Sequence, residues 1–567
     1  MAAGKKKRGG AYASLSMRPA PKGREIDPRA LEQVVELLGS EPRRRDLLIE
    51  HLHKIQDRFG HITAAHLGAL AYEMRLTFAE VYEVATFYHH FDFVKDGEAP
   101  PAPVTVRVCE SIACHLAGGE ALLNDLKDRL GENIRVLAAP CIGMCDVAPA
   151  AIVGKNSIGQ VTTDVVVQAL ETQQTDPGIP AYAGYSGYLE RGGYRTYATC
   201  VNGTRNVADV IATVTASGLR GLGGAGFPSG RKWEFVRKEP APRIAVLNAD
   251  EGEPGTFKDR FCFETDPHRV LEGLLIAAWV VDASAIYIYL RDEYAAARTI
   301  LTREIAELQA DPPGPLPPIY LRRGAGAYIC GEETSLIESI EGKRGEPRLR
   351  PPFPAQWGVF GRPTLVHNVE SVYWLREILE KGADHFATRG INGRNGARLF
   401  SVSGRVKQPG VYLAPNGVTV RQLIDEYAGG MLPGHELYAY LPGGASGGIL
   451  PASLADEPLD FDVLAKHGCF IGSAAIVVLS NHDSAKDAAL NLMQFFAHES
   501  CGKCTPCRAG TAKSVHIMQN GKWDLPLLAD LATAMSDASI CGLGQAAPNP
   551  VRCVQQFFPH ELNEANA

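Results

Sequence analysis

The spacing of apolar residues changes character several times along this chain. Between residues 27 and 89, apolar side chains recur every three or four positions, as at Leu31, Val34 and Leu38. This is the spacing of one buried helix face, so a small helical bundle is predicted for residues 27–99. After a proline-rich stretch, Val104–Cys109 alternates apolar and polar residues as a strand does. Residues 100–172 are therefore predicted to form an α/β unit.

The second half of the chain begins with a different alternation. Short apolar strands such as Ile244–Leu247 and Ile286–Leu290 alternate with helical stretches such as Val270–Val281. Such alternation indicates βαβ units and a largely parallel sheet. The helical signal then drops, with strand-like runs around one predicted helix, Arg421–Tyr427, as in a small β-grasp-like module. The predicted boundaries are 1–26 for a basic tail, 173–204 for a linker, 205–397 for the α/β region, 398–483 for the β-grasp-like module and 484–567 for a helical end.

Composition narrows the class of protein. The chain has 567 residues, 45% of them hydrophobic and 21% charged, which suits a soluble protein of several domains. A net charge of −7 argues against nucleic acid as the main partner. The longest apolar stretch, Leu274–Val281, is far shorter than a membrane span of about 20 residues. We therefore expect a cytoplasmic protein without membrane insertion.

The first 25 residues are an exception to the acidic character. They contain seven Lys or Arg, clustered at Lys5–Arg8, and a single acid. No apolar run follows, so this is not a signal peptide. A solvated, disordered tail and a docking arm for a partner subunit both remain open.

Three closely spaced cysteines near the C-terminus carry the most specific chemistry. Cys501, Cys504 and Cys507 form C-x2-C-x2-C, and Cys541 follows at a distance. A [4Fe–4S] cluster needs one thiolate for each iron, and such a turn directs three of them to one point. The spacing therefore predicts a cluster that moves single electrons.

Two more cysteine pairs lie in the front half of the chain. Cys109 and Cys114 are spaced C-x4-C, and Cys141 and Cys145 are spaced C-x3-C. Two pairs on two strand-to-loop turns can converge on a [2Fe–2S] cluster. Zinc is the main alternative for four cysteines, although structural zinc usually favours a tighter knuckle. The remaining cysteines are expected to be small buried hydrophobes: Cys200, Cys262, Cys330, Cys469 and Cys553.

A glycine-rich loop matches G-x-G-x-x-G but stands in the wrong context for a standard dinucleotide fingerprint. Gly221, Gly223, Gly224 and Gly226 follow a predicted helix, whereas the fingerprint follows a strand. The glycines still allow a backbone to approach a phosphate or a flat ring closely. Arg231, Lys232 and Trp233 come next and offer charge and a ring for stacking.

Two further loops follow predicted strands. The acidic segment from Asn248 to Arg260 follows one strand, and ligands of open α/β sheets bind beyond such strand ends. A solvated acidic loop is the alternative for this segment taken alone. The loop from Arg323 to Thr334 follows another strand and opens a helix, which is the strand–loop–helix context that phosphate-binding loops use.

Together these segments resemble a known family. Asn248-Ala-Asp-Glu-Gly-Glu-Pro-Gly, Gly-Ala-Tyr328-Ile-Cys-Gly-Glu-Glu, Glu-Ser-Cys-Gly-Lys-Cys-Thr-Pro-Cys-Arg and Cys-Gly-Leu-Gly544 resemble the NADH-binding flavoprotein subunit of respiratory complex I and its soluble relatives. Residues 27–172 resemble the thioredoxin-like [2Fe–2S] subunit of the same enzymes, fused in front. The resemblance covers nearly the whole chain and implies a multidomain fold with a Rossmann-like FMN/NAD domain.

The resemblance also implies the cofactor contacts. FMN would lie on the first glycine loop and the Asn248 loop, with Tyr328, Gly331 and Glu332 closing over it and NAD above the flavin ring. Glu253 is the residue expected to tune the flavin or to position the nicotinamide. The full expected set is Gly221, Gly223, Gly224, Gly226, Phe227, Lys232, Asn248, Asp250, Glu251, Glu253, Phe257, Tyr328, Gly331, Glu332, Glu333, Lys343, Asn368 and Ser371.

Some positions depart from the family pattern. Leu222 stands where the family usually has Arg, and Arg231 stands where an aliphatic residue is common. The late flavin loop, usually Asn-Asn-Val-Glu-Thr, is His367-Asn-Val-Glu-Ser371 here. These changes bear on the phosphate contacts and leave the cysteines untouched.

The family implies an electron-transfer (diaphorase) subunit of a heteromeric complex. The fused front domain disfavours ordinary complex I, and the chain ends soon after Cys553 with no appended ferredoxin module. All four front cysteines are present, whereas some hydrogenase diaphorase subunits lack that cluster. These features favour the β subunit of NAD-dependent formate dehydrogenase. Its partners would be a catalytic subunit with molybdenum or tungsten (or nickel) and further clusters, and a small [2Fe–2S] subunit. A non-catalytic electron-wire scaffold is the hypothesis from a different class.

Overall fold

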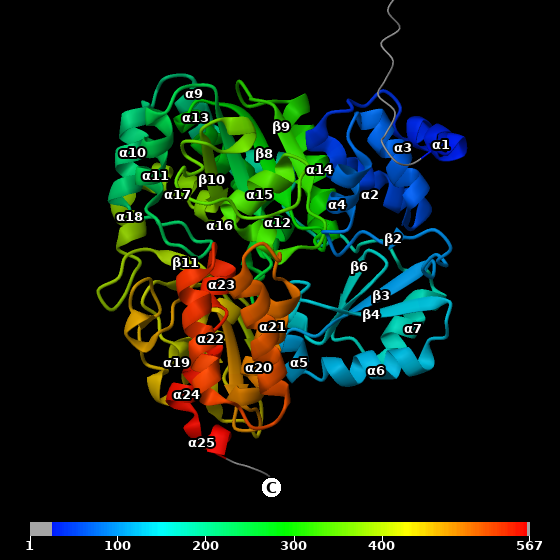
Figure 1. Cartoon of the computed structure of the whole chain (residues 1–567). Helices are drawn as coiled ribbons and strands as arrows, with labels where there is room; N and C mark the ends of the chain where they lie inside the picture. Colours follow the sequence, from blue (N-terminus) through cyan, green and yellow to red (C-terminus); the bar gives the residue numbers. More distant parts are fainter. Residues whose placement is uncertain (1–24, 564–567) are drawn as a thin grey trace, which may run out of the picture.

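The computed structural model describes residues 25–563, so the expected basic tail, residues 1–26, lies almost wholly outside the described residues. Figure 1 shows five regions in chain order, coloured from blue to red. None of the helices between residues 25 and 563 is long and apolar enough to cross a membrane.

The first region is helical, as the periodicity predicts. Asp27 caps the first helix by accepting a hydrogen bond from the Ala30 amide, and Thr77 and Glu80 form a reciprocal capping box on the fourth. A short parallel pair, β1 (Ile62–Thr63) and β2 (Phe93–Val94), closes the bundle. The helices are α1 (Pro28–Leu38), a 3-10 turn (Arg45–Leu47), α2 (Leu48–Phe59), α3 (Ala64–Met74) and α4 (Phe78–Ala85).

The second region is a four-stranded sheet in the order β4-β3-β5-β6. β3 pairs with β4 in parallel and with β5 antiparallel. Its strands are β3 (Val104–Cys109), β4 (Ile134–Ala139), β5 (Ala150–Val153) and β6 (Asn156–Gly159), and its helices are α5 (Ile112–Leu116), α6 (Gly119–Arg129), the 3-10 turn Cys145–Val147 and α7 (Thr163–Glu171).

The expected linker, residues 173–204, differs from its prediction. It contains two helices, α8 (Tyr185–Glu190) and α9 (Arg195–Val201). The carboxylate of Glu272, fully buried, accepts hydrogen bonds from the Tyr188 hydroxyl (2.5 Å) and from the Tyr194 (2.9 Å) and Tyr197 (3.1 Å) amides. The glycine, proline and serine content of this segment concealed a set of buried tyrosines that need such a partner.

The third region is built on the parallel sheet β10-β7-β8-β9. The strand order sets Asn248, near the end of β7, directly beside Asn368, at the end of β10. The strands are β7 (Arg243–Ala249), β8 (Ala283–Leu290), β9 (Ile319–Arg323) and β10 (Thr364–Asn368). The helices are α10 (Val207–Ala216), α11 (Ser229–Lys238), α12 (Lys258–Thr265), α13 (Pro267–Val280), α14 (Ala295–Ala310), α15 (Glu333–Ile340), α16 (Val369–Tyr373), α17 (Leu375–Lys381) and α18 (Ala383–Ala387), with 3-10 turns Tyr328–Gly331 and Val359–Gly361.

The fourth region is a mixed five-stranded sheet and the fifth is helical. The sheet order is β12-β11-β15-β13-β14, from β11 (Ala397–Gly404), β12 (Gly410–Pro415), β13 (Leu437–Leu441), β14 (Leu450–Pro451) and β15 (Ala475–Ser480). The predicted helix is present as α19 (Val420–Gln422) continued by a π turn (Leu423–Tyr427), and 3-10 turns lie at Ala445–Gly447, Ala452–Leu454 and Leu464–His467. The final helices are α20 (Ala485–His498), α21 (Thr505–Gln519), α22 (Leu525–Ala538), α23 (Gly542–Ala546), α24 (Asn549–Phe557) and α25 (Pro559–Asn563).

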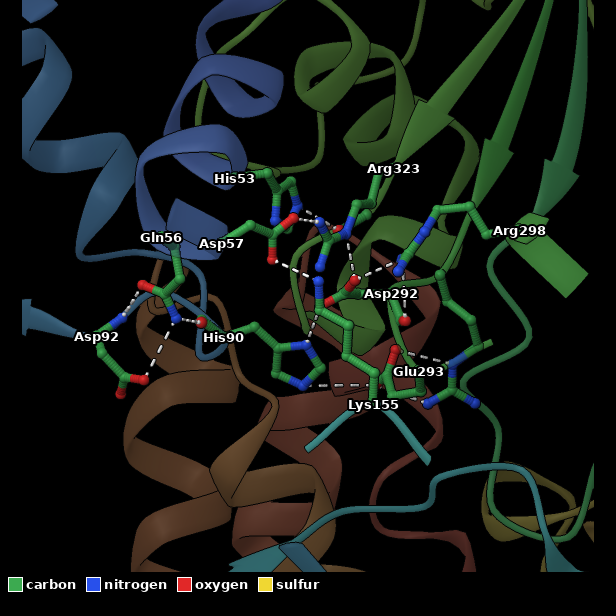
Figure 2. A network of polar contacts seen from close by, with 12 residues as sticks. His53, Gln56, Asp57, His90, Asp92, Lys155, Asp292, Glu293, Arg298 and Arg323 are labelled. Atoms are coloured by element: carbon green, nitrogen blue, oxygen red, sulfur yellow. Dashed lines mark hydrogen bonds and ion pairs between the residues drawn. The ribbon is translucent and has the colours of Figure 1, made fainter. Parts of the chain in front are cut away.

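A charged network joins the first three regions (Figure 2). Asp292, which follows β8, accepts hydrogen bonds from His90 (2.7 Å) and Arg298 (2.9 Å) and pairs with Arg323 (2.5 Å). Asp57 on α2 pairs with Arg323 (2.7 Å) and with Lys155 (2.9 Å) of the second region. The first two regions are thus held against the parallel sheet by shared ion pairs.

Candidate redox site

The four front cysteines come together at one point. Cys109 ends β3, Cys114 lies on α5, and Cys141 and Cys145 flank the loop after β4. All four are buried, and the Cys141 and Cys145 sulfurs are 3.5 Å apart. Hydrogen bonds with Cys114 and Cys141 hold the pKa of Cys109 well above its usual value. Four converging sulfurs are the donor set that a two-iron cluster requires.

Side chains from the parallel-sheet region surround the second cysteine pair. Arg291 donates to the Cys141 carbonyl (2.6 Å), and Arg260 donates to the Gly143 carbonyl (2.6 Å) and pairs with Asp146 (2.7 Å). Gly143 adopts a φ of +75°, and a Cβ there would collide with the Tyr294 ring. The conformation of the loop that carries Cys141 and Cys145 therefore depends on contacts from the parallel-sheet region.

The four rear cysteines line one small cavity. Cys504 directly precedes α21 and Cys541 directly precedes α23. Burial raises the pKa of Cys507 to about 11 and that of Cys541 to about 12. Ile329 and Pro347 of the third region complete the lining. Four thiols around one hollow fit a four-iron cluster.

The first glycine loop lies between two helices, α10 and α11, as its context predicts. The Leu222 amide donates to the Ser371 hydroxyl (2.8 Å), which fixes the loop against α16. A Cβ on Gly223 would lie 2.9 Å from the Asn368 Cβ. The close approach of these two segments requires glycine at position 223.

The strand ends bring the next predicted residues together. The Asn248 amide donates to the Gly331 carbonyl (2.8 Å), and the Asn368 amide donates to Asp259 (2.6 Å). Asp250, which follows Asn248, has a buried carboxylate oxygen without a hydrogen-bond partner among the described residues. Burial raises its pKa well above the usual value. An unpartnered buried oxygen beside a glycine loop suits a polar ligand such as the flavin ring edge.

Two of the acids expected at the cofactor accept hydrogen bonds at helix ends. Glu251 accepts from the Asp259 (2.8 Å) and Arg260 (3.1 Å) amides and from the Tyr294 hydroxyl (2.9 Å), and burial raises its pKa to about 8. Glu332 accepts from the Thr334 and Ser335 amides, both at 2.9 Å, at the start of α15.

Glu253 and Tyr328 join four separate segments. The Tyr328 hydroxyl donates to Glu253, whose other oxygen accepts from the Ser446 amide (2.7 Å). The Tyr328 amide donates to Glu499 (2.9 Å), two residues before Cys501. Burial raises the pKa of Glu253. Sequence reasoning did not single out Ser446, although the glycine-rich run around it, Gly443–Gly448, was a usable signal.

The residues expected to contact NAD do not all lie together. Phe227 is 40% exposed, and Lys232 donates to the Val366 carbonyl (2.8 Å) and lies 3.6 Å from Glu333. Lys232 and Glu333 therefore form a partly exposed ion pair, and the Phe227 ring is accessible. Lys343 pairs instead with Glu341 (2.6 Å) and Glu338 (3.3 Å) on α15 and just after it.

Phe257, one of the expected cofactor contacts, is fully buried. Its side chain is 0% exposed and packs with Ala113, Cys141 and Cys145. Its amide donates to the Ser401 hydroxyl (3.1 Å). The ring therefore belongs to the apolar surroundings of the front cysteines.

The other cysteines behave as expected. Cys200, Cys262 and Cys330 are buried. Cys469 and Cys553 are also buried, with their sulfurs 3.4 Å apart. None of these five lines the cavity of the rear cysteines.

Four family models match the chain in the order of the regions. They are the thioredoxin-like [2Fe-2S] ferredoxin (residues 34–174), the Nuo51 FMN-binding domain (214–377), the SLBB domain (399–450) and the NADH-ubiquinone oxidoreductase-F iron-sulfur binding region (487–565). The first match favours [2Fe–2S] over zinc at the front cysteines. The cofactors of the chain are FMN, NAD, one [2Fe–2S] cluster and one [4Fe–4S] cluster.

Curated relatives and solved structures agree with these matches. An NADH-quinone oxidoreductase subunit of Rhizobium meliloti is 40% identical over 394 residues, which are 66% of this chain and 93% of the relative. The mitochondrial 51 kDa subunit of NADH-ubiquinone oxidoreductase in Neurospora crassa is 43% identical over 374 residues, 62% of this chain and 76% of the relative. A crystal structure of NAD⁺-reducing [NiFe]-hydrogenase superimposes with a TM-score of 0.80 at 31% identity, over 92% of this chain and 94% of the other.

Fold and site together define a diaphorase-type flavoprotein with two iron–sulfur clusters. The chain belongs to the family of the complex I 51 kDa flavoproteins and carries a thioredoxin-like [2Fe–2S] domain in front.

Proposed function

We propose that this chain exchanges hydride between NAD and FMN and passes single electrons between FMN and its clusters, as the diaphorase subunit of an NAD-dependent formate dehydrogenase. One observation carries the electron-transfer part. Ile329, in the loop expected to close over the flavin, also lines the cavity of the four rear cysteines. Flavin and cluster would therefore be close neighbours with only one loop between them.

Each group of residues has a role in this proposal. Cys109, Cys114, Cys141 and Cys145 ligate the [2Fe–2S] cluster, and Cys501, Cys504, Cys507 and Cys541 ligate the [4Fe–4S] cluster. FMN supplies the conversion between two-electron and one-electron chemistry. The glycine loop, Asn248, Asp250 and Asn368 hold it, and the Tyr328–Glu253 pair orients the ring. Phe227, Lys232 and Glu333 contact NAD in this proposal.

The assembly is proposed from the architecture of the chain. The Rhizobium meliloti relative aligns over only 66% of this chain, whereas the NAD⁺-reducing hydrogenase chain aligns over 92% of it, front domain included. This supports an NAD-reducing complex with a fused front domain over complex I. The four converging front cysteines support an enzyme in which that cluster is retained, as in formate dehydrogenase. A molybdenum or tungsten subunit and a small [2Fe–2S] subunit are then the partners.

An [NiFe] hydrogenase is the second candidate, and the same structural likeness favours it. Metal analysis of the complex purified through this chain separates the two. Molybdenum or tungsten supports the proposal, and nickel supports the hydrogenase.

The diaphorase activity itself is tested on the isolated, cluster-replete chain. We expect NADH-dependent reduction of an artificial dye when FMN is bound. If the flavin-loaded chain is inactive, the scaffold hypothesis replaces this one.

A further inference from the structure

Two histidines and one glutamate from distant parts of the chain meet outside the cysteine sites. His89 lies between α4 and β2 of the first region, and His498 ends α20, directly before Glu499. One ligand atom from each lies within 4.8 Å of the other two. Figure 1 places the bundle and α20 in separate regions of the molecule, so the meeting is a product of the fold.

The geometry of the three side chains suits a metal ion. The two imidazole rings have centroids 4.4 Å apart and are tilted by 50°, and both side chains are exposed. Glu499 is 4% exposed, and its Oε1 lies 3.1 Å from His498 Nδ1. An exposed histidine pair over a buried carboxylate leaves an open side for an ion to approach.

A supporting contact fixes the carboxylate. The second oxygen of Glu499 accepts a hydrogen bond from the Tyr328 amide (2.9 Å). Partners of this kind orient metal ligands and raise affinity. The backbone amide of His89 in turn donates to the Gly326 carbonyl (3.3 Å), in the loop that carries Tyr328. Glu499 and His89 are thus both hydrogen-bonded to the loop that contains Gly326 and Tyr328.

We propose that His89, His498 and Glu499 bind a divalent transition-metal ion of the zinc type, with water as the fourth ligand. Zinc accepts imidazole nitrogen and carboxylate oxygen at about 2.0–2.2 Å in a tetrahedron, which needs ligand atoms about 3.3 Å apart. The ligand atoms now lie within 4.8 Å of one another, so the two exposed histidine side chains must move closer as the ion binds. Binding is a ligand exchange in which the ion loses water and the His498 ring releases the Nδ1 proton of its hydrogen bond to Glu499 (3.1 Å) to solvent, so that the freed nitrogen lone pair and the carboxylate both face the ion, with no change in oxidation state.

The bound ion would connect the bundle to the rear cysteine segment. It would cross-link residue 89 to residues 498 and 499, next to Cys501, and hold the Tyr328 loop through Glu499. This site is independent of the proposed function, because it uses none of the cluster cysteines and none of the expected flavin contacts except the Tyr328 backbone.

The test measures zinc on the complete chain, verified to contain its iron and flavin. After chelator treatment, dialysis against buffered Zn²⁺ should leave one zinc per chain. His89→Gln and His498→Gln should each weaken zinc binding at least about ten-fold, in line with the loss of a group in a metal site. His516→Gln, an exposed histidine on α21, is the matched control and should bind as the parent does.

X-ray absorption at the zinc edge tests the ligand set separately. The proposal expects a shell of nitrogen and oxygen without sulfur. Sulfur neighbours would place the zinc on cluster cysteines and overturn the proposal. Unchanged zinc affinity in the His89→Gln/His498→Gln double variant, at parental iron and flavin content, would overturn it too.

Discussion

The two cysteine sites are enclosed in different ways. The front site is buried on all four cysteines, and Arg260, Arg291 and Phe257 of the flavin region pack around it. At the rear site Cys501 and Cys504 are partly exposed, and the loops that bear most of the cysteines, between the C-terminal helices, provide most of the cavity wall.

The two cysteine sites should therefore depend on different parts of the molecule for their stability. The front site needs the interface with its neighbour, because that interface supplies the hydrogen bonds of its loop. The rear site needs chiefly its own C-terminal region and touches the flavin region through Ile329 and Pro347. Four predictions test this contrast, beginning with the largest effect.

Cys504→Ser should remove the rear cluster alone. Iron content should fall from about six to about two atoms per chain, because each missing thiolate leaves an iron without its ligand. Electron flow beyond the flavin should stop. Iron analysis and electron paramagnetic resonance of the reduced protein measure both effects.

Cys553→Ser is the matched control for that variant. Its sulfur is buried next to Cys469 and outside the cavity. Loss of about four irons in this control would show that the ligand assignment is wrong.

Arg260→Met should destabilise the front site selectively. It removes a buried guanidinium that pairs with Asp146 and the Gly143 carbonyl, and breaking such a buried pair costs about 3–5 kcal/mol. The [2Fe–2S] absorption should be lost at lower temperature while the rear cluster is retained. Arg129→Met removes an exposed pair with Asp164 and should cost under about 1 kcal/mol. Equal loss of both clusters would contradict the contrast.

His53→Gln should reduce the loss of stability in acid, because His53 lies between the first region and the parallel-sheet region. His53 contacts the Gly324 carbonyl (2.8 Å), and burial, assisted by Arg323, lowers its pKa to about 3. The folded pKa is below the unfolded value of about 6.5, so the neutral ring contributes stability above pH ~6.5 that is lost as the pH falls.

The slope due to this one proton approaches about 1.4 kcal/mol per pH unit. Melting temperatures of parent and variant between pH ~5.5 and ~7.5 measure it. Parallel curves would mean that His53 is not the responsible group.

Glu253→Gln should have the smallest effect on stability and a local effect on function. The amide retains an oxygen for Tyr328 or Ser446 but removes the charge beside the expected flavin. We expect the rate of flavin reduction by NADH to fall about three- to ten-fold, about 0.7–1.4 kcal/mol, with a shift in flavin potential. Stopped-flow kinetics and a redox titration measure these. If both are unchanged, Glu253 has no role in hydride transfer.

The sequence predicted the regular elements and the cysteine groupings well. Residues such as Val34 and Leu38 repeat at helical spacing, and C-x2-C-x2-C fixes three thiols locally, so neither depends on distant contacts. The helices of residues 185–201 were missed because their stability comes from the buried carboxylate of Glu272, which is remote in sequence.

The flavin surroundings were predicted less completely for the same reason. The Asn248 side chain contacts Gly331, whereas Glu251 accepts a hydrogen bond from Tyr294 and Phe257 packs against Cys141 and Cys145. The direction of the side chains in the loop after Asn248 depends on where the front domain packs, which the sequence does not show. The bridging role of Ser446 likewise depends on the approach of a separate sheet.

The charged contacts of Asp292, Arg323 and Asp57 join parts of a single polypeptide. Two separate chains held by such contacts would come apart on dilution. A covalent tether instead keeps the partners at an effective concentration of about millimolar. The association of front and flavin regions should therefore be insensitive to protein concentration and respond to ionic strength instead, and each molecule carries its two clusters in a fixed one-to-one ratio.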